Sequence, residues 1–493
     1  MRVYGSFFVL LSFVGFCYAA AHSFPDDLKA TGVKAVFPGD ASYSGYDHTY
    51  NKRFNFNPAA ITFPNNARQV AQVVKVGSAY KYPVVARSGG HSYIANGLGG
   101  KNGAVVIDLR NLKQITVSSS GIATIQTGNR LGNVALGLNS RGRALPHGTC
   151  PYVGIGGHSS YGGWGFTSRM WGLTLDTIRW MEVVLANGTI TTITPENYDL
   201  FWAMRGAAPS FGVTTSISVQ TFPAPSSAII FQYVWNMGPS EAAKAVSLFQ
   251  QFAKTNIPKE FGAEFTIGRG NPAGQLYFSL TGVYYGSAQS LHSTLAPYLQ
   301  KVRQPDSTKI TPGSYIESVQ TLGGLGTLDT SAPDKGDTFY SKSLMTPSAS
   351  PISDAALNAF MSYMANEGSQ TDLGWFAEMD LYGGTNSAVN SVPVDTTAFG
   401  RRNALWTIQL YASSSNRQPP YPSSGFTFLN NMANSLTSNS PSDWDIGAYP
   451  NYPDKGLTNW QKLYYGSHYS RLQSIKRQYD PHNTFSFPQS IEL

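Results

Sequence analysis

The sequence predicts an α+β protein with two domains. Its 493 residues are enough for more than one hydrophobic core, and 42% of them are apolar while only 13% are charged, which excludes a disordered chain. Short strand-like runs alternate with helix-like patterns from about residue 57 to 222. Longer strand-like runs begin after residue 226, so the second part of the chain is expected to form a different kind of sheet.

The first 21 residues have the pattern of a secretory signal. Arg2 precedes an apolar run from Phe7 to Cys17, and Ala19–Ala21 supply the small residues of a cleavage site. The run is too short to cross a bilayer, and no other stretch reaches about 18 apolar residues. We therefore expect a secreted, extracellular protein without a membrane partner, the alternative being a buried N-terminal helix. The mature chain would keep Cys150 as its one cysteine and form no internal disulfide.

Local patterns predict the elements of the first domain. Asn66 is a favourable cap for a helix whose apolar positions Val70, Val73 and Val74 are spaced i, i+3, i+4. A hairpin is expected around Asn187-Gly188, because this pair accepts the positive φ angles of a two-residue turn. Asn187 also begins an N-glycosylation sequon. Strands are predicted at residues 83–86, 104–107, 122–127, 180–185 and 190–193.

A proline-rich linker at residues 223–227 separates the second domain. Further strands are predicted at residues 229–235, 263–267, 277–283, 375–382 and 405–411. A turn-rich stretch over residues 418–425 precedes the last segment. We therefore expect a signal at 1–21, a first domain at 22–225 with its core at about 57–222, a second domain at 226–430, and a C-terminal segment at 431–493.

Charge and motif patterns exclude several function classes. The 35 basic and 28 acidic residues give a net charge of +7, but the basic residues are scattered, so no nucleic-acid partner is expected. The sequence lacks the P-loop, zinc-protease, lipase and G-x-G-x-x-G motifs. Its histidines are isolated in sequence, so no metal site is expected either. The 28 Tyr, 27 Phe and 9 Trp suit stacking against neutral polar ligands such as sugars.

Two glycine-rich segments carry most of the chemical information. They cover Arg87–Tyr93 and His147–Gly157. Adjacent glycines after a strand let backbone N–H groups converge on an anion such as a pyrophosphate, and Ser88 and Ser92 add hydroxyl donors. The residues alone leave His91 open as a loop histidine that caps a carbonyl, and Cys150 as a small buried hydrophobe.

These segments, together with Gly162–Gly165, Gly172–Asp176, Asp199–Gly206 and Tyr479–Phe485, resemble the vanillyl-alcohol-oxidase superfamily, and within it the berberine-bridge-enzyme-like group. The resemblance runs from about Tyr50 to the C-terminus. It implies a two-part FAD-binding domain of the PCMH type and a substrate domain with a large antiparallel sheet flanked by helices. It also implies FAD attached twice, through His91 to the 8α-methyl group and through Cys150 to C6. The expected cofactor-binding residues are Arg87, Ser88, Gly89, Gly90, His91, Ser92, Cys150, Gly154, Gly156 and Gly157.

The second half resembles the fungal oligosaccharide oxidases at Trp375–Gly384, Leu405–Tyr411 and Ala448–Asp454. This resemblance implies oxidation of the C1 hydroxyl of a reducing mono- or oligosaccharide to the lactone, with O₂ reduced to H₂O₂. It assigns catalysis to Tyr452, with Asp380 as its partner. The substrate-binding residues that it implies are Tyr93, Glu264, Glu378 and Gln409.

The residues themselves give partial support to this assignment. Glu378 and Asp380 are two apart on a predicted strand and so share one face, although a solvated strand face is the alternative. A free tyrosine with a pKa of about 10 is a poor base at neutral pH. Tyr452 would therefore need a stabilised phenolate, or would take the proton as hydride leaves the sugar. Arg269 follows the strand of Glu264 and is expected to influence the choice of sugar.

Two other functions remain open at this point. The same bicovalent flavin fold would also suit a phenolic or alkaloid-like secondary metabolite. A glycoside hydrolase or carbohydrate-binding protein would use Glu264, Glu378 and Asp380 around an aromatic groove. A monomer is expected in either case. The chain departs from the family pattern by lacking a disulfide in the flavin domain and by carrying Ala207–Gly212 where a glycine-rich run is expected.

Overall fold

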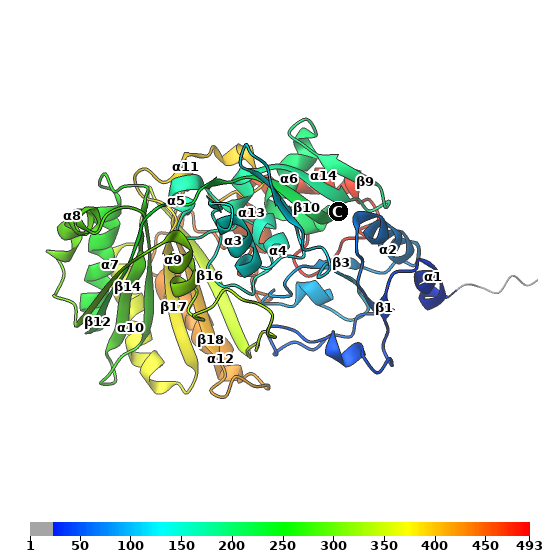
Figure 1. The fold of residues 1–493 in the computed structure, drawn as a ribbon. Coiled ribbons are helices and arrows are strands. Elements are labelled where there is room, and N and C mark those ends of the chain that lie inside the picture. Colours follow the sequence, from blue (N-terminus) through cyan, green and yellow to red (C-terminus); the bar gives the residue numbers. More distant parts are fainter. Residues whose placement is uncertain (1–22) are drawn as a thin grey trace, which may run out of the picture.

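The structure, a computed structural model, describes residues 23–493. The signal expected over residues 1–21 lies outside the described residues. Small sheets from the first half of the chain lie beside one large sheet from the second half (Figure 1). Helices cover one face of the large sheet, and the α+β prediction is confirmed.

The first sheet is mostly parallel. Its strands follow the order β1-β2-β4-β3, and β4 pairs in parallel with both β2 and β3. They are β1 (Ala35–Val36), β2 (Ala60–Thr62), β3 (Val84–Arg87) and β4 (Val105–Asp108). Helix α2 (Ala67–Ala79) connects β2 to β3 and is capped as predicted, because Asn66 accepts a hydrogen bond from the backbone N–H of Gln69 at 3.0 Å.

The second sheet is antiparallel, in the order β5-β6-β10-β8-β9. Its strands are β5 (Ile115–Val117), β6 (Ile122–Gln126), β8 (Ile178–Val184), β9 (Ile190–Ile193) and β10 (Val213–Gln220). The predicted β8–β9 hairpin is present, but the prediction of a two-residue turn is wrong. Leu185 pairs with Thr189 around a three-residue loop in which Gly188 alone has a positive φ, of 77°. Strand β10, which the sequence analysis missed, occupies the centre of this sheet.

The large sheet has seven antiparallel strands in the order β15-β12-β14-β13-β17-β18-β16. They are β12 (Ala228–Met237), β13 (Phe261–Arg269), β14 (Leu276–Tyr284), β15 (Ser307–Gly313), β16 (Phe339–Pro347), β17 (Gly374–Leu381) and β18 (Ala404–Ser413). All five strands predicted for this region are present. The sequence analysis missed strands β15 and β16. Strand β15 is an exposed edge strand without apolar alternation, so it carries no strand pattern in the sequence.

Alternation along the central strands separates a core face from a cavity face. Phe265, Met379 and Ile408 are fully buried in the main hydrophobic core. Their neighbours in sequence point to the opposite face. The helices packed on the core side include α7 (Pro239–Ala253), α10 (Asp354–Gln370) and α12 (Ser423–Thr437) (Figure 1). The cavity face is therefore free to carry polar groups.

Among the remaining helices, α8 (Ala288–Leu299) packs beside α7 on the core of the large sheet, and the others link the sheets or cover the first half of the chain. These others are α1 (Phe24–Ala30), α3 (Leu131–Asn139), α4 (Ile155–Ser160), α5 (Ser168–Trp171), α6 (Tyr198–Ala207), α9 (Tyr315–Leu322), α11 (Ala388–Ser391), α13 (Trp460–Tyr465) and α14 (Tyr469–Tyr479). A two-strand ladder joins β7 (Arg143–Ala144) to β11 (Phe222–Pro223). None of the helices in residues 23–493 is long and apolar enough to cross a membrane.

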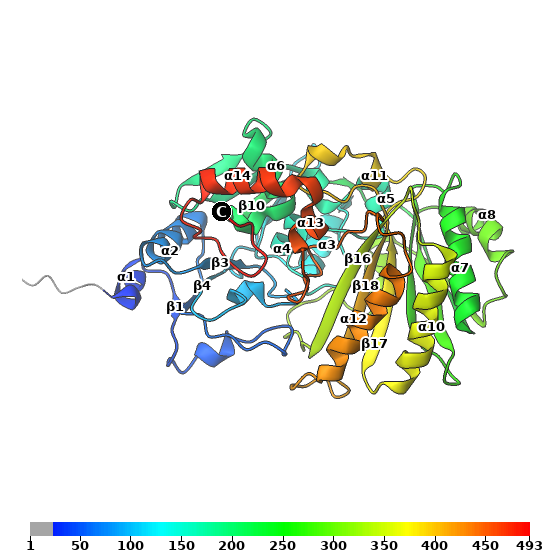
Figure 2. The same ribbon diagram turned by 180° about the vertical axis from the view of Figure 1, so that it is seen from behind.

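The C-terminal segment returns to the first half of the chain. Helix α14 lies beside α6 (Figure 2), and the backbone N–H of Val84 on β3 donates to the carbonyl of Thr484 at 2.8 Å. The side chain of Lys476 is fully buried and pairs with Asp480 at 2.7 Å. The expected boundary at residue 430 falls inside α12, which packs on the large sheet, so the segment that leaves the sheet begins after Thr437.

Candidate active site

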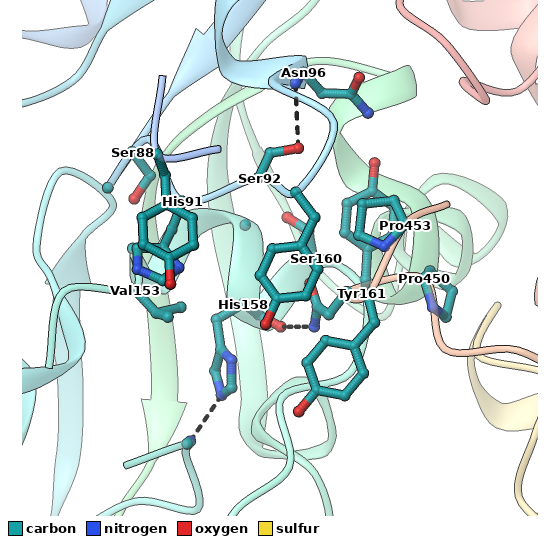
Figure 3. A pocket seen from close by; sticks show the side chains of 18 of the residues that line it. Ser88, His91, Ser92, Asn96, Val153, His158, Ser160, Tyr161, Pro450 and Pro453 are labelled. Atoms are coloured by element: carbon teal, nitrogen blue, oxygen red, sulfur yellow. Dashed lines mark hydrogen bonds between the residues drawn. The ribbon is translucent and has the colours of Figure 1, made fainter. Parts of the chain in front are cut away.

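A cavity of about 590 Å³ lies where the glycine-rich segments meet the large sheet. Its lining includes both glycine-rich segments, polar residues of β13, β17 and β18, and the stretch 449–453. Figure 3 shows Ser88 and His91 on one side of this pocket and Tyr161 and Pro450 on the other. Residues far apart in sequence therefore line one space.

The two glycine-rich segments touch through their backbones. A Cβ placed on Gly89 would lie 2.4 Å from the backbone nitrogen of Gly154, and one on Gly154 would lie 2.1 Å from that of Gly89. Only glycine permits this approach. Gly90 also adopts a positive φ of 74°. The loops thus form a bare backbone cradle on the cavity, whose N–H groups and size fit the phosphates and ring system of a dinucleotide.

The polar side chains of the first loop mainly hold the loop itself. Ser88 donates its hydroxyl proton to the carbonyl of Thr127 and accepts from the N–H of Gly156 at 3.2 Å. The Ser92 hydroxyl accepts from the N–H of Asn96 at 3.2 Å. The Ser88 hydroxyl proton is thus used within the protein, whereas Ser92 only accepts, and its expected role as a donor to the cofactor stays a prediction.

Arg87 lines the cavity, but its charge is used elsewhere. Its guanidinium nitrogens lie 2.6 and 2.7 Å from one carboxylate oxygen of Asp108, and both side chains are buried. A further bond of 2.7 Å joins it to the carbonyl of Tyr46. Arg87 and Asp108 face each other across β3 and β4. Arg87 therefore holds the strands behind the loop, and its contact with the cofactor stays a prediction.

His91 and Cys150 come together on the cavity wall. The imidazole Nε2 lies 3.2 Å from a carboxylate oxygen of Asp334, and the ring stacks on Tyr50 with 3.6 Å between centroids. Burial lowers the pKa of His91, but its hydrogen bonds to Asp334 and Cys150 raise it more. Burial raises the pKa of Cys150, but the hydrogen bond from His91 brings it below the usual value. This pairing favours a nucleophilic thiolate.

The opposite wall is a cluster of three carboxyl groups on neighbouring strands. Glu264 on β13 faces Asp380 on β17, and Glu378 lies two residues before Asp380. Oxygen atoms of the three groups lie within 4.8 Å of one another. One oxygen of Asp380, which is 1% exposed, has no hydrogen-bond partner within residues 23–493. The solvated-strand alternative is therefore wrong for this face.

Burial and mutual repulsion keep protons on this cluster. Burial raises the pKa of Glu378 to about 7. The pKa of Glu264 lies well above its usual value because of burial and the nearby Glu378. Burial followed by repulsion from both glutamates raises the pKa of Asp380 in the same way. At neutral pH the three groups together therefore hold protons that they can exchange with a neighbour.

Tyr452 lies near both this cluster and Tyr93 of the first glycine-rich segment. Its ring stacks parallel to Tyr93 at 5.7 Å and meets Tyr449 edge-on at 5.1 Å. Burial, then the charges of Asp380 and Glu378, raise the pKa of Tyr452 well above 10. Tyr452 is thus a neutral phenol at rest. The sequence-predicted residues Tyr93, Glu264, Glu378, Gln409 and Tyr452 line the same cavity, and Asp380 lies opposite Glu264 on the neighbouring strand.

Gln409 supports Tyr93. Its amide nitrogen donates to the Tyr93 hydroxyl at 2.9 Å across 316 positions of sequence. Gln409 also faces Glu378 across β17 and β18. Gln409 therefore belongs to the polar wall, but one N–H group of its amide is used to position Tyr93.

An aromatic stack continues the same face outward. Phe376 precedes Glu378 by two residues and stacks on Tyr411 at 4.9 Å, which in turn stacks on Phe339 at 4.6 Å. Phe376 and Tyr411 line the cavity. The sequence analysis expected an aromatic platform without identifying its members. Their signal was present, because positions 376, 378 and 380 share one face of a strand.

Two results differ from expectation in other ways. The guanidinium of Arg269 binds the carbonyls of Gly368, Thr371 and Leu373 and is absent from the cavity lining, so the expected influence on sugar choice is replaced by an anchoring role.

The sequence analysis missed Tyr50 and Asp334, which hold His91. No motif surrounds either residue, and only the folded chain brings them to residue 91.

Comparison with known proteins identifies the family. The model described as "FAD binding domain" matches residues 58–194, and the model described as "Berberine and berberine like" matches residues 448–492. A chitooligosaccharide oxidase of Gibberella zeae is 36% identical over 92% of this chain and 91% of its own length. The FAD-linked oxidoreductase dpmaF of Metarhizium anisopliae is 34% identical over 95% of this chain and 91% of its own length.

Solved structures agree with this assignment. One is titled "Functional roles of the 6-s-cysteinyl, 8 alpha-N1-histidyl FAD in Glucooligosaccharide Oxidase from Acremonium strictum". It superimposes with a TM-score of 0.89 at 33% identity and covers 96% of this chain and 99% of that chain. The match extends over both the flavin-binding and the large-sheet parts. The chain belongs to the berberine-bridge-enzyme-like family of FAD-linked oxidases, which includes the fungal oligosaccharide oxidases.

Proposed function

We propose that this protein oxidises the C1 hydroxyl of reducing mono- or oligosaccharides to the lactone and passes the electrons to O₂, which yields H₂O₂. The observation that carries the proposal is one cavity that joins the flavin-binding loops to a wall of hydrogen-bonding side chains and an aromatic rim. Polar groups suit sugar hydroxyls, and aromatic faces suit the apolar faces of pyranose rings. The similarity to oligosaccharide oxidases supports the same substrate class.

The cofactor in this proposal is FAD attached through His91 and Cys150. Both side chains lie on the cavity wall beside the backbone cradle of Gly89 and Gly154. Bound FAD supplies the two-electron acceptor for C1 oxidation. The covalent histidyl and cysteinyl links named for the Acremonium strictum enzyme support the same two links here. They also give the lone mature cysteine a function.

Tyr452 and Asp380 move the proton in this proposal. Tyr452 is too weak a base to hold the C1 hydroxyl proton as a free phenolate, since its pKa is raised. It accepts that proton while it gives its own phenolic proton to the unpartnered oxygen of Asp380. The carboxyl cluster is suited to this step because its raised pKa values make a protonated carboxyl stable.

The polar wall orders the substrate along the strands. Asp380, Glu378 and Phe376 are two residues apart on one face of β17, with Thr407, Gln409 and Tyr411 opposite the same positions on β18. The reducing ring would lie at the Asp380 end and further rings towards Phe376 and Tyr411. This arrangement favours an oligosaccharide, because the further rings would bind to the protein at a distance from the C1 carbon that reacts.

A secondary-metabolite oxidase is the second candidate. The aromatic rim at Phe376 and Tyr411 would also accept a flat phenolic ring. Sequence similarity alone does not choose between the two substrate classes, because dpmaF, whose name states no sugar substrate, is about as similar to this chain as the chitooligosaccharide oxidase is. The three carboxyl groups favour a polyol. The hydrolase alternative is set aside, since the chain belongs to an FAD-linked oxidase family.

The test is a substrate panel read by two signals. Purified wild-type protein is mixed with cellobiose, lactose, maltose, xylobiose or chitobiose, while H₂O₂ is measured in air and flavin bleaching is followed without oxygen. Bleaching and peroxide with a sugar support the proposal. Bleaching with aromatic alcohols and with none of the sugars would overturn it in favour of the second candidate.

The same preparation tests the links and the location. We expect flavin to remain with acid-precipitated wild type and to be released from the His91→Ala, Cys150→Ala double variant. Flavin that stays with the precipitated double variant would contradict the link assignment.

We also propose secretion as a monomer after cleavage of the signal at residues 1–21. The N-terminal sequence and the size-exclusion mass of protein from culture medium check both statements.

A further inference from the structure

His91 has two neighbours that the proposed oxidation does not use. Asp334 lies 3.2 Å from Nε2, and the Tyr50 ring lies 3.6 Å away at an angle of 22°. The His91 side chain is 11% exposed and that of Asp334 is 27% exposed. The carboxylate therefore meets the imidazole in a largely enclosed place, where such a hydrogen bond is strong.

The neighbours are fixed by the same backbone clamp. Segments 50–52 and 334–338 meet in a parallel bridge between Asn51 and Asp337. The N–H of Lys52 donates to the carbonyl of Asp337 at 2.7 Å, and the N–H of Asp337 donates to that of Tyr50 at 2.9 Å. Tyr50 and Asp334 thus approach His91 from segments that are bound to each other.

The other end of the loop that carries Asp334 is also anchored. The hydroxyl of Thr330 donates to Asn133 of α3 at 2.9 Å, and Arg130 donates to the carbonyl of Thr330 at 3.4 Å. Two anchors, at residues 330 and 337, leave Asp334 little freedom. Such support by outer residues is what precise placement of a reacting group requires.

The contact decides which imidazole nitrogen is reactive. A carboxylate only accepts hydrogen bonds, so the nitrogen that faces Asp334 carries the proton. Nδ1 carries no proton when His91 is neutral, and it then has the lone pair that attachment requires; the ion pair of protonated His91 with the Cys150 thiolate is the other protonation state of the same pair. The stacked Tyr50 ring holds the imidazole plane. Nδ1 is therefore oriented as a nucleophile.

We propose that Asp334 is a positioning residue for flavin attachment, which holds His91 in its Nε2–H tautomer and accepts that proton as Nδ1 bonds to the 8α carbon of FAD. This inference rests on the proposed attachment at His91. It concerns how the cofactor becomes linked, which is separate from sugar oxidation.

The step balances with O₂ as the oxidant. One C–H bond of the 8α-methyl group breaks, and one C–N bond forms at Nδ1. Two electrons pass to the flavin and then to O₂. The two protons that complete H₂O₂ come from the broken C–H bond and, by way of Asp334, from Nε2 of His91. The ring of His91 is neutral before and after the step.

The experiment uses a Cys150→Ala background, so that every covalent link depends on His91. Apo-protein is mixed with FAD, and the flavin that stays with acid-precipitated protein is followed over time. In the Cys150→Ala, Asp334→Asn variant the attachment rate is expected to fall about 10-fold or more, the low end of what an outer partner of a histidine contributes. Asp334→Glu should restore much of the rate.

Two controls separate this role from a folding defect. Asp329 lies on the same loop and binds Ser331, away from His91, so Asp329→Asn in the same background should attach FAD at the parental rate. Total bound flavin before acid treatment should be equal in all variants. Equal attachment rates in the Asp334→Asn variant and its parent would overturn the proposal.

A further outcome distinguishes the two levels of inference. If the Cys150→Ala parent binds FAD but attaches none, then His91 is not a link, and the role of Asp334 falls with it. Peroxide formation from sugars by the wild type is measured separately. Peroxide formation therefore tests the oxidase function, and the attachment rate tests the role of Asp334.

Discussion

At the scale of residues, the site depends on groups whose protonation is shifted by burial. Tyr452, Asp380 and the two glutamates are weaker acids here than in water. Perturbed groups that converge on one cavity are typical of catalysis. Their chemistry gives two predictions about activity.

The Tyr452→Phe variant is expected to lose about 10² to 10⁴-fold in kcat, since it lacks the hydroxyl that takes the C1 proton. The ring and its stacking on Tyr93 remain. Steady-state peroxide formation measures the loss, and an unchanged flavin spectrum shows that the cofactor site is intact. A kcat near the wild-type value would assign the proton transfer to another group.

Activity should fall as the pH is lowered, because Asp380 accepts a proton only when it is itself deprotonated, and burial followed by repulsion from the two glutamates raises its pKa well above the usual value. Glu378→Gln removes a negative neighbour that raises the pKa of Asp380. The acidic limb of kcat/KM against pH should therefore move to lower pH in this variant. A limb that stays in place, or moves upward, would show that the cluster does not control the reaction.

At the scale of elements, the flavin loop is held by the strands behind it. Arg87 and Asp108 form a buried pair across β3 and β4. Arg110 also binds Asp108, but its side chain is 44% exposed. This difference allows a matched comparison.

Arg87→Ala should lower the free energy of unfolding by about 3 to 5 kcal/mol, because the Asp108 charge loses its buried partner. Arg110→Ala should cost about 1 kcal/mol or less, as is usual for an exposed partner. Urea unfolding measures both. Equal effects of the two substitutions would contradict the structural role assigned to Arg87.

At the scale of the whole molecule, the cavity requires both halves of the chain. The N-terminal half supplies the backbone cradle, and the seven-stranded sheet supplies the carboxyl wall and the aromatic rim. The C-terminal stretch 449–453 adds Tyr452. A ligand bound at this junction should therefore stabilise the entire fold.

Removal of FAD tests this coupling. The His91→Ala, Cys150→Ala variant, freed of flavin by dialysis, should melt at lower temperature than the same variant in excess FAD. At 100 times the Kd the added stability is about 2.7 kcal/mol. Differential scanning calorimetry over a range of FAD concentrations measures the shift, and a Tm independent of FAD would show that the site is not coupled to folding.

The sequence by itself determined the elements and the chemistry that short motifs encode. Asn66 predicted the start of α2, and alternation predicted the central strands and the shared face of Glu378 and Asp380. The two glycine-rich segments predicted a cofactor cradle, because close backbone contact leaves a glycine signature. These signals are local, so one sequence is enough to read them.

Only the tertiary structure decided which distant residues meet. Gln409 binds Tyr93 across 316 positions, and Asp334 reaches His91 through a loop that carries no motif. The structure also revealed the structural contacts of Arg87 and Arg269, and it placed Arg269 outside the cavity lining. Such pairings depend on strand order and loop anchoring over long separations. No periodicity or spacing along the chain records them, because side-chain partners are chosen by packing in space.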